Sequence, residues 1–265
     1  MRILICSFLF LFLFVQPVFA EPTPQLKKEL AIVIDDLGNN MKGTKEILSL
    51  PVKLTVAIMP FMPSTKEDAE LANENGHEVI IHLPMEPKKG KKSWLGPGAI
   101  TSDLSDQEIR ERVESAIKDV PHAVGMNNHM GSKITEDERI MKIILEVCRE
   151  NALYFLDSQT TENSVVSEVG AQMNVPVLEN NLFFDAIYTA QHIKKQADLL
   201  SKQLIDHEKI IAIGHVGVPG PMTFSVLKEY IPVYQNQAEF VSLTDLIPEF
   251  NIIDGIESSN MVEDD

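Results

Sequence analysis

Side chains suited to metal-assisted hydrolysis recur directly after apolar runs of this 265-residue sequence. Asp35 and Asp36 follow one such run, and His82, His129 and His215 each follow another. Imidazole and carboxylate groups are ligands that Zn²⁺ and similar cations prefer, and both also act as general acids and bases. The carboxyl ends of parallel strands meet at one face of an α/β fold. If these runs are parallel strands, the five side chains meet there, and Asp36, His82 and His129 are the candidate metal ligands.

Two further acids and one aromatic residue are open to more than one interpretation. Glu86, four residues after His82, is equally compatible with a metal ligand, a hydrogen-bond partner of a ligand, or a solvated loop acid. Asp157 either orients a catalytic group or caps the following turn, and we favour orientation. The pair Asp35-Asp36 could itself cap a helix or form an Asx turn. For Trp94, we favour a loop anchor that packs on the domain over a platform for a sugar ring.

The elements that must position these residues alternate along the chain. Helical patterns separate the strands, and the boxes Ser64-x-x-Glu67, Ser105-x-x-Glu108 and Thr135-x-x-Glu138 mark three helix starts. We expect strands at 30–34, 54–58, 78–81, 123–126, 154–156, 175–178, 210–213 and 239–243. This alternation predicts an α/β fold, a single distorted (β/α) barrel with about seven parallel strands, and the alternative is a doubly wound open sheet. Glycine-rich phosphate-binding motifs are absent, which argues against nucleotide binding.

The two ends of the chain differ from the rest in composition. Residues 1–20 have Arg2, an apolar run and a small residue at position 20, a pattern typical of a secretory signal peptide. The alternative, an uncleaved membrane anchor, has a shorter run than the roughly 20 residues that a bilayer requires. We expect a flexible lead-in at 21–29, the barrel at 30–250 and an acidic flexible tail at 251–265. The sequence therefore predicts an exported protein, periplasmic or secreted, without a stable membrane span after signal removal.

Charge and cysteine content narrow the range of partners. With 23 Lys and Arg against 39 Asp and Glu, the formal net charge is −16, which disfavours binding to a nucleic acid. Removal of residues 1–20 would take away Cys6 and leave Cys148 without a partner for an intramolecular disulfide. Cys148 falls in a helical apolar pattern, so we expect a buried structural thiol.

Several of these motifs together resemble a known family. The segments Ile32-Val-Ile-Asp-Asp36 and Gly76-His-Glu-Val-Ile-Ile-His-Leu-Pro-Met-Glu-Pro87 resemble the polysaccharide deacetylase (NodB-like) family. With Asn127-Asn-His-Met-Gly-Ser132, Phe155-Leu-Asp-Ser158 and Ile213-Gly-His-Val-Gly217, the chain is similar to its divergent polysaccharide deacetylase branch over about Leu30 to Ile247.

The resemblance implies roles for the candidate residues. Asp35 corresponds to the general base, Asp36 to a metal ligand and His215 to the general acid of the family. His82 is the first ligand of a His-x-x-x-His box whose second position is occupied here by Glu86.

The resemblance leaves two assignments open, namely the remaining metal ligand and the residue that orients the general acid His215. Either Glu86 or His129 supplies the missing metal ligand, and we prefer His129. Asp157 would hold His215 or another catalytic group in its working tautomer. The family's Arg-x-Pro-aromatic motif is absent, and residues 127–130 stand roughly in its place.

The implied function is that of an exported metal-dependent hydrolase. It would remove N- or O-acetyl groups from a cell-envelope polysaccharide or oligosaccharide with the help of a divalent cation, most simply zinc. One alternative is a catalytically impaired carbohydrate-binding or envelope-assembly protein on the same fold. The same residues would also suit a metal hydrolase of another kind, such as a phosphohydrolase, or an Fe(II) oxygenase.

Overall fold

The computed structural model describes residues 28–248, so the predicted signal peptide at 1–20 and tail at 251–265 lie outside the described residues. Nine strands of this part of the chain form one sheet, and their pairings are parallel. The strands are β1 (Glu29–Leu37), β2 (Thr55–Ile58), β3 (Glu78–Met85), β4 (Ala123–Met130), β5 (Tyr154–Asp157), β6 (Val177–Glu179), β7 (Leu182–Phe183), β8 (Lys209–His215) and β9 (Glu239–Phe240). The helices are α1 (Thr44–Leu48), α2 (Thr65–Glu74), α3 (Asp106–Asp119), α4 (Glu138–Glu150), α5 (Val166–Met173), α6 (Ala190–Asp206) and α7 (Gly220–Gln235).

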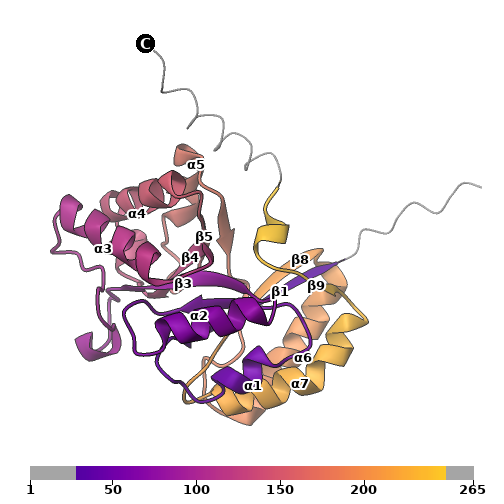
Figure 1. The fold of residues 1–265 in the computed structure, drawn as a ribbon. Helices are drawn as coiled ribbons and strands as arrows, with labels where there is room; N and C mark the ends of the chain where they lie inside the picture. The colour runs from indigo at the N-terminus through magenta and orange to yellow at the C-terminus, as the bar shows by residue number, and fades with distance from the viewer. Residues whose placement is uncertain (1–27, 249–265) are drawn as a thin grey trace, which may run out of the picture.

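The sheet curls into a half-barrel. Its strand order is β6-β5-β4-β3-β2-β1-β8-β7, with β9 beside β1 (Figure 1). The two ends of this order, β6 and β7, are joined by only Asn180 and Asn181, which span about 10 Å at most. Asn180 N donates to Asp157 O on one side, and Asn181 N donates to Ile211 O on the other. The two edge strands are therefore linked through Asn180 and Asn181 without pairing directly, and the predicted distorted (β/α) barrel is confirmed.

Alternate residues of each strand face two different cores. Ile32 and Ile34 of β1 belong to the large cluster that includes the apolar faces of the helices. Ala31 and Val33 belong to a smaller cluster that is built almost wholly from strands and from the segment Val241–Ile247. Because side chains alternate along a strand, the second cluster marks the concave inner face of the sheet and the first marks its helix-covered outer face.

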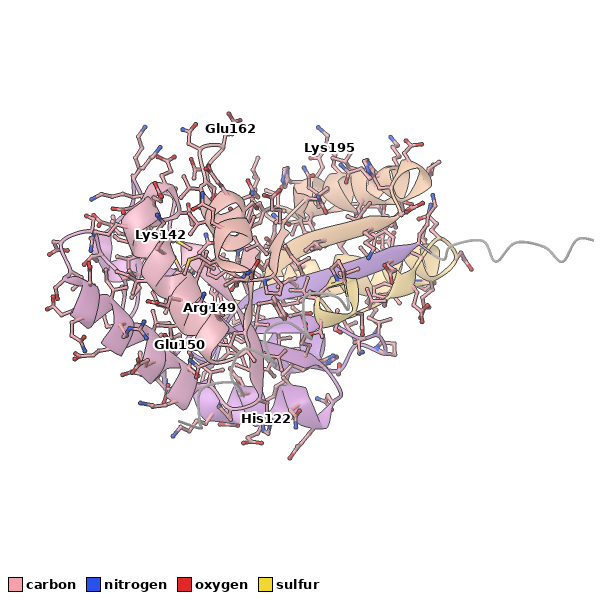
Figure 2. The ribbon with its side chains drawn as sticks, turned by 90° about the horizontal axis from the view of Figure 1, so that it is seen from above. His122, Lys142, Arg149, Glu150, Glu162 and Lys195 are labelled. Atoms are coloured by element: carbon pink, nitrogen blue, oxygen red, sulfur yellow. The ribbon has the colours of Figure 1, made fainter. Side chains whose placement is uncertain are left out.

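The outer surface of the helices is charged. Viewed from above, the labelled side chains of Lys142 and Arg149 on α4 and Lys195 on α6 lie on the outside of the helical layer (Figure 2). Cys148, on the opposite side of α4, is fully buried, as expected, and burial raises the pKa of its thiol to about 12. Within residues 28–248, no helix is long and apolar enough to cross a membrane.

The predicted helix starts had mixed outcomes. The capping box at Ser105 is formed: its hydroxyl accepts from Glu108 N while the Glu108 carboxylate accepts from Ser105 N. The box at Ser64 is not, because the Ser64 hydroxyl donates to Asp68 instead. The predicted helix start at Ser64 is nevertheless correct, because Ser64 is the N-cap residue of α2. The start predicted at Thr135 was wrong: Thr135 lies in a 3₁₀ turn, and the carboxylate of Asp137 caps α4.

Candidate metal centre

A break in the regular strand brings two consecutive carboxylates to one place. In a regular strand, Asp35 and Asp36 would face opposite sides of the sheet. Here the register between β1 and β2 shifts between Ile34 and Leu37, and Asp36 adopts a left-handed backbone with φ of 71°. Aspartate tolerates this conformation better than most residues. Asp35 Oδ2 consequently lies 3.8 Å from His82 Nε2, and Asp36 Oδ1 lies 3.2 Å from the same nitrogen.

Three side chains from three strands converge at this point. Asp36 Oδ1, His82 Nε2 and His129 Nδ1 form a triangle of donor atoms. Its sides are 3.2 Å between Asp36 and His82, 3.0 Å between Asp36 and His129, and 3.0 Å between the two imidazoles. His82 is on β3 and His129 is on the neighbouring β4, where it pairs with Pro84, two residues further along β3. Among the described residues, this trio is the group of metal-binding side chains that could hold one ion.

The trio fits a divalent cation. Zn²⁺ binds nitrogen and oxygen at about 2.0–2.2 Å, so two ligands of one ion lie no more than about 4.4 Å apart, and all three sides meet this limit. Asp36 Oδ1 is shielded from solvent, and the ring nitrogens of His82 and His129 are the polar side-chain atoms beside it. A cation bound between these three atoms would satisfy the buried oxygen. The two imidazoles and one carboxylate are a donor set that suits zinc and related metals.

Burial and charge shift the pKa values of Asp35 and Asp36 in opposite directions. Burial raises the pKa of Asp35, against the opposing effect of His82 and His215. Burial also acts on Asp36, but the nearby His129 and His82 outweigh it and hold the pKa of Asp36 well below its ordinary value. Asp36 therefore stays ionised at neutral pH, which is the form that a metal ligand requires.

His215 lies at the end of β8, in register with Asp35 on β1. Its Nδ1 lies 2.7 Å from Asp185 Oδ1, and its backbone N–H donates to Asp185 Oδ2 at 2.8 Å. Thr223 of α7 also donates to Asp185 Oδ2, so the fully buried carboxylate is held from both sides. Burial alone would lower the pKa of His215, but the hydrogen bond and charge of Asp185 raise it to about 9.

The predicted role of Asp157 as the partner of His215 was therefore wrong. On β5, Tyr154 and Leu156 line the inner core, so Asp157 points to the other face of the sheet. There its carboxylate accepts hydrogen bonds from Gln159 and Ser164. Asp157 thus caps the turn after β5, the second of its two interpretations. The sequence analysis did not single out Asp185, because the strand before it, β7, is only two residues long. The pattern that could have identified Asp185 is an acidic residue directly after the apolar pair Phe183-Phe184.

Like Asp157, Glu86 does not reach the candidate metal site. β3 continues to Met85, and four residues of extended chain place Glu86 about 13 Å along the strand from His82. Its carboxylate accepts hydrogen bonds from Lys133 and Ser102 at 2.8 Å, and the positive charge of Lys133 helps to lower its pKa. Of the two candidates for the remaining ligand, the geometry places His129 in the trio and Glu86 in a loop contact.

Trp94 approaches the cluster through its backbone. The carbonyl oxygen of Trp94 lies 3.1 Å from His129 Nε2, while the residue as a whole is 58 % exposed. The expected packing of Trp94 on the barrel was therefore wrong. The loop between β3 and α3 instead reaches the centre with a carbonyl group and leaves its aromatic ring in solvent.

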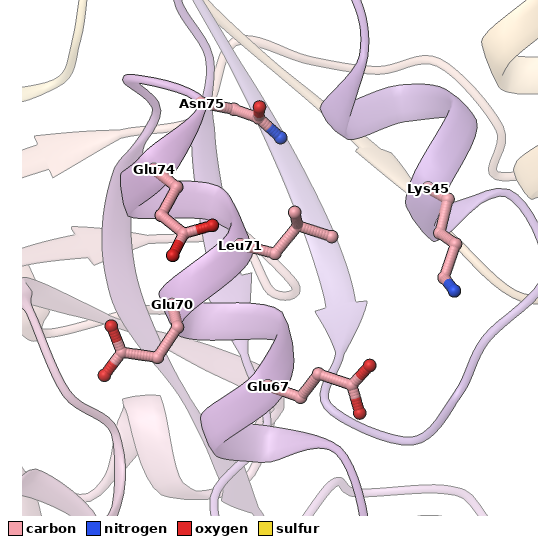
Figure 3. Close-up of a pocket in the computed structure, with 6 residues that line it drawn as sticks. All are labelled: Lys45, Glu67, Glu70, Leu71, Glu74 and Asn75. Carbon is pink, nitrogen blue, oxygen red and sulfur yellow. The ribbon is translucent and has the colours of Figure 1, made fainter.

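A hollow on the helical surface lies apart from this centre. It lies beside α1 and α2, with Lys45 on one side and Glu67, Glu70 and Glu74 on the other (Figure 3). Its lining shares no residue with the trio, with Asp35 or with His215. The groups suited to catalysis converge at the carboxyl ends of the strands and not in this hollow.

Comparison with known proteins places this arrangement in a family. The chain belongs to the divergent polysaccharide deacetylase family, whose model matches residues 32–247. It is 33% identical over 247 residues to the uncharacterized protein YibQ of Escherichia coli K12, covering 93% of this chain and 76% of that protein. It is also 33% identical over 202 residues to an uncharacterized protein of Haemophilus influenzae, covering 76% and 70%. The crystal structure of the uncharacterized protein ATU2773 from Agrobacterium tumefaciens C58 has a TM-score of 0.77 at 17% identity, covering 84% of this chain and 91% of that one, and so shares its fold.

Proposed function

We propose that this protein is an exported, metal-dependent hydrolase that removes N- or O-acetyl groups from a cell-envelope carbohydrate. The observation that carries the proposal is the trio of Asp36, His82 and His129 with Asp35 and His215 beside it. Membership of the divergent polysaccharide deacetylase family supports the substrate class. The signal-like sequence of residues 1–20 supports export.

Each residue of the site has a task in such a reaction. Asp36, His82 and His129 would hold a divalent cation, most simply zinc, which when bound polarises the acetyl carbonyl and lowers the pKa of water. Asp35 accepts the proton of the attacking water, and burial strengthens it as a base by raising its pKa. His215 donates a proton to the departing amine or alcohol. Its contact with Asp185 keeps it protonated at neutral pH.

Acetate release tests the proposal. The purified protein, supplied with Zn²⁺ or Co²⁺, is incubated with peptidoglycan fragments, chito-oligosaccharides and O-acetylated glycans, and acetate is measured. We expect release by the wild type and a loss of about 100-fold or more in Asp35→Asn and His215→Ala, which remove the base and the acid. Asp206→Asn and His207→Ala change exposed residues at the end of α6 and are the matched controls.

Different results would favour different functions. Glycan binding with no acetate release would identify a catalytically impaired carbohydrate-binding protein. Hydrolysis of phosphate esters without deacetylation would identify a different hydrolase on the same fold. Acetate release that survives in Asp35→Asn and His215→Ala would contradict the assignment of this site.

A further inference from the structure

Asn127, whose sequence motif alone gave it no role, joins the two halves of the centre. It lies on β4 directly opposite His82 on β3, so both side chains point into the inner face of the sheet. Its side chain is fully buried, and its amide contacts His82, Asp35 and, at 3.4 Å, the hydroxyl of Ser158. Asn127 Oδ1 lies 2.7 Å from His82 Nδ1, and Asn127 Nδ2 donates to Asp35 Oδ1 at 2.9 Å.

These contacts fix the hydrogen on His82. An ionised Asp35 can only accept a hydrogen bond, so the amide nitrogen of Asn127 must face it. The amide oxygen then faces His82, and because that oxygen can only accept, His82 Nδ1 must carry the hydrogen. In the neutral ring that a metal ligand requires, the other ring nitrogen, Nε2, then has the lone pair, and it faces Asp36 and His129. One amide thus sets the tautomer of a candidate ligand and the position of the candidate base.

We propose that Asn127 is a positioning residue: its oxygen orients His82 for metal binding, and its nitrogen holds Asp35 beside the metal site. This inference rests on the proposed metal-dependent function for its first half. Its second half concerns the metal-free protein and stands without that function. Asn127 is not one of the three side chains of the candidate metal site.

Metal affinity tests the first half. Zn²⁺ and Co²⁺ are titrated into chelator-treated wild type, Asn127→Leu and Asn127→Asp. Leucine removes the acceptor, so we expect metal binding weaker by about 10- to 100-fold. Aspartate keeps an acceptor for His82 and adds negative charge, so affinity should equal or exceed that of the wild type. Equal affinity in Asn127→Leu, or weakening in Asn127→Asp as large as that in Asn127→Leu, would overturn the proposal.

A residue swap tests the second half in the metal-free protein. Asn127→Asp sets two buried carboxylates against each other and should lower the Tm. In the double variant Asp35→Asn/Asn127→Asp, the amide and the carboxylate exchange places and can bond again, so we expect at least half of the lost Tm to return. Asn128→Asp is the matched control, because Asn128 faces the outer side and contacts Met130, Thr160 and Ser158 instead. Simple addition of the two single-variant effects would contradict the Asn127–Asp35 contact.

The outcomes distinguish this inference from the proposed function. Absence of metal binding by the wild type would refute both the proposed function and the first half of the inference. Metal binding by the wild type that is unchanged in Asn127→Leu would refute the inference alone.

Discussion

The backbone at Asp36 decides which chemistry this site can perform. A φ of 71° at one residue allows two neighbouring carboxylates to serve one site, one as a candidate ligand and the other as a candidate base. Their environments push their pKa values apart, upward for Asp35 and downward for Asp36. Groups whose environments separate their pKa values in this way are typical of sites that use one as a base and keep the other ionised.

The buried carboxylate of Asp185 sets the charge of His215. Because the pKa of His215 is raised from 6.5 to about 9 in the folded protein, its contribution to stability is fully present below pH 6.5 and is lost as the pH rises through about 9. That contribution is about 3 kcal/mol at most. In Asp185→Asn, the charge is lost, and we expect the pKa of His215 to fall and this pH dependence of the unfolding free energy to shrink.

Nuclear magnetic resonance titration of the His215 ring in the metal-free protein measures this effect directly. Asp198→Asn is the control, since Asp198 bonds to Tyr230 instead. A wild-type midpoint below pH 7, or the same midpoint in Asp185→Asn, would contradict the role of Asp185.

Among the elements, the alternation of side chains explains which residues reach the site. Val33 and Asp35 on β1, Ile80 and His82 on β3, and Ile213 and His215 on β8 continue the rows of the inner core to the carboxyl ends of their strands. The same rule turns Asp157 outward on β5. The site is thus a layer of polar side chains on the inner face of the barrel, at the carboxyl ends of the strands and directly beyond the apolar inner core.

Gly125 on β4 shows how tightly the layer below the site is packed. A Cβ at this position would lie 2.5–2.7 Å from three ring atoms of Tyr154, whose hydroxyl donates to Glu78. Gly125→Ala must therefore displace the tyrosine ring, and we expect a loss of about 1–3 kcal/mol in the free energy of unfolding. Denaturant unfolding measures this loss. In Val124→Ala, an exposed position on the same strand, we expect a change below about 1 kcal/mol, and equal losses in both variants would contradict this explanation.

Sequence patterns identified the longer elements, and the missed features have local causes. Apolar runs such as 30–34 and 210–213 predicted β1 and β8, because strands buried on both faces are continuously apolar. β7 escaped notice because Leu182–Phe183 is too short to show a period, and Asp185 was missed with it. Glu86 was a candidate because of its spacing from His82, and that spacing no longer brings two side chains together once β3 extends to Met85.

In the molecule as a whole, the parallel strands of the barrel bring residues that are far apart in the sequence together at one site. Asp36, His82 and His129 are widely separated in the chain but meet because β1, β3 and β4 end at the same mouth. The rule that parallel strands present their carboxyl ends together predicted this meeting from the sequence alone. The hydrogen-bond partners that orient the imidazoles, Asn127 and Asp185, depend on strand register and could not be predicted from spacing.

Metal binding by the purified protein is the decisive measurement for this centre. Trp94 is the only tryptophan, and its carbonyl contacts His129, so its fluorescence can be followed while Zn²⁺ or Co²⁺ is added to chelator-treated protein. We predict one bound metal ion per chain and a fluorescence change in the wild type and in the control His122→Ala, whose histidine pairs with Glu70 on the surface. His82→Ala, His129→Ala and Asp36→Asn should lose the bound metal. Full metal occupancy in His82→Ala would contradict the assignment of the trio as the metal site.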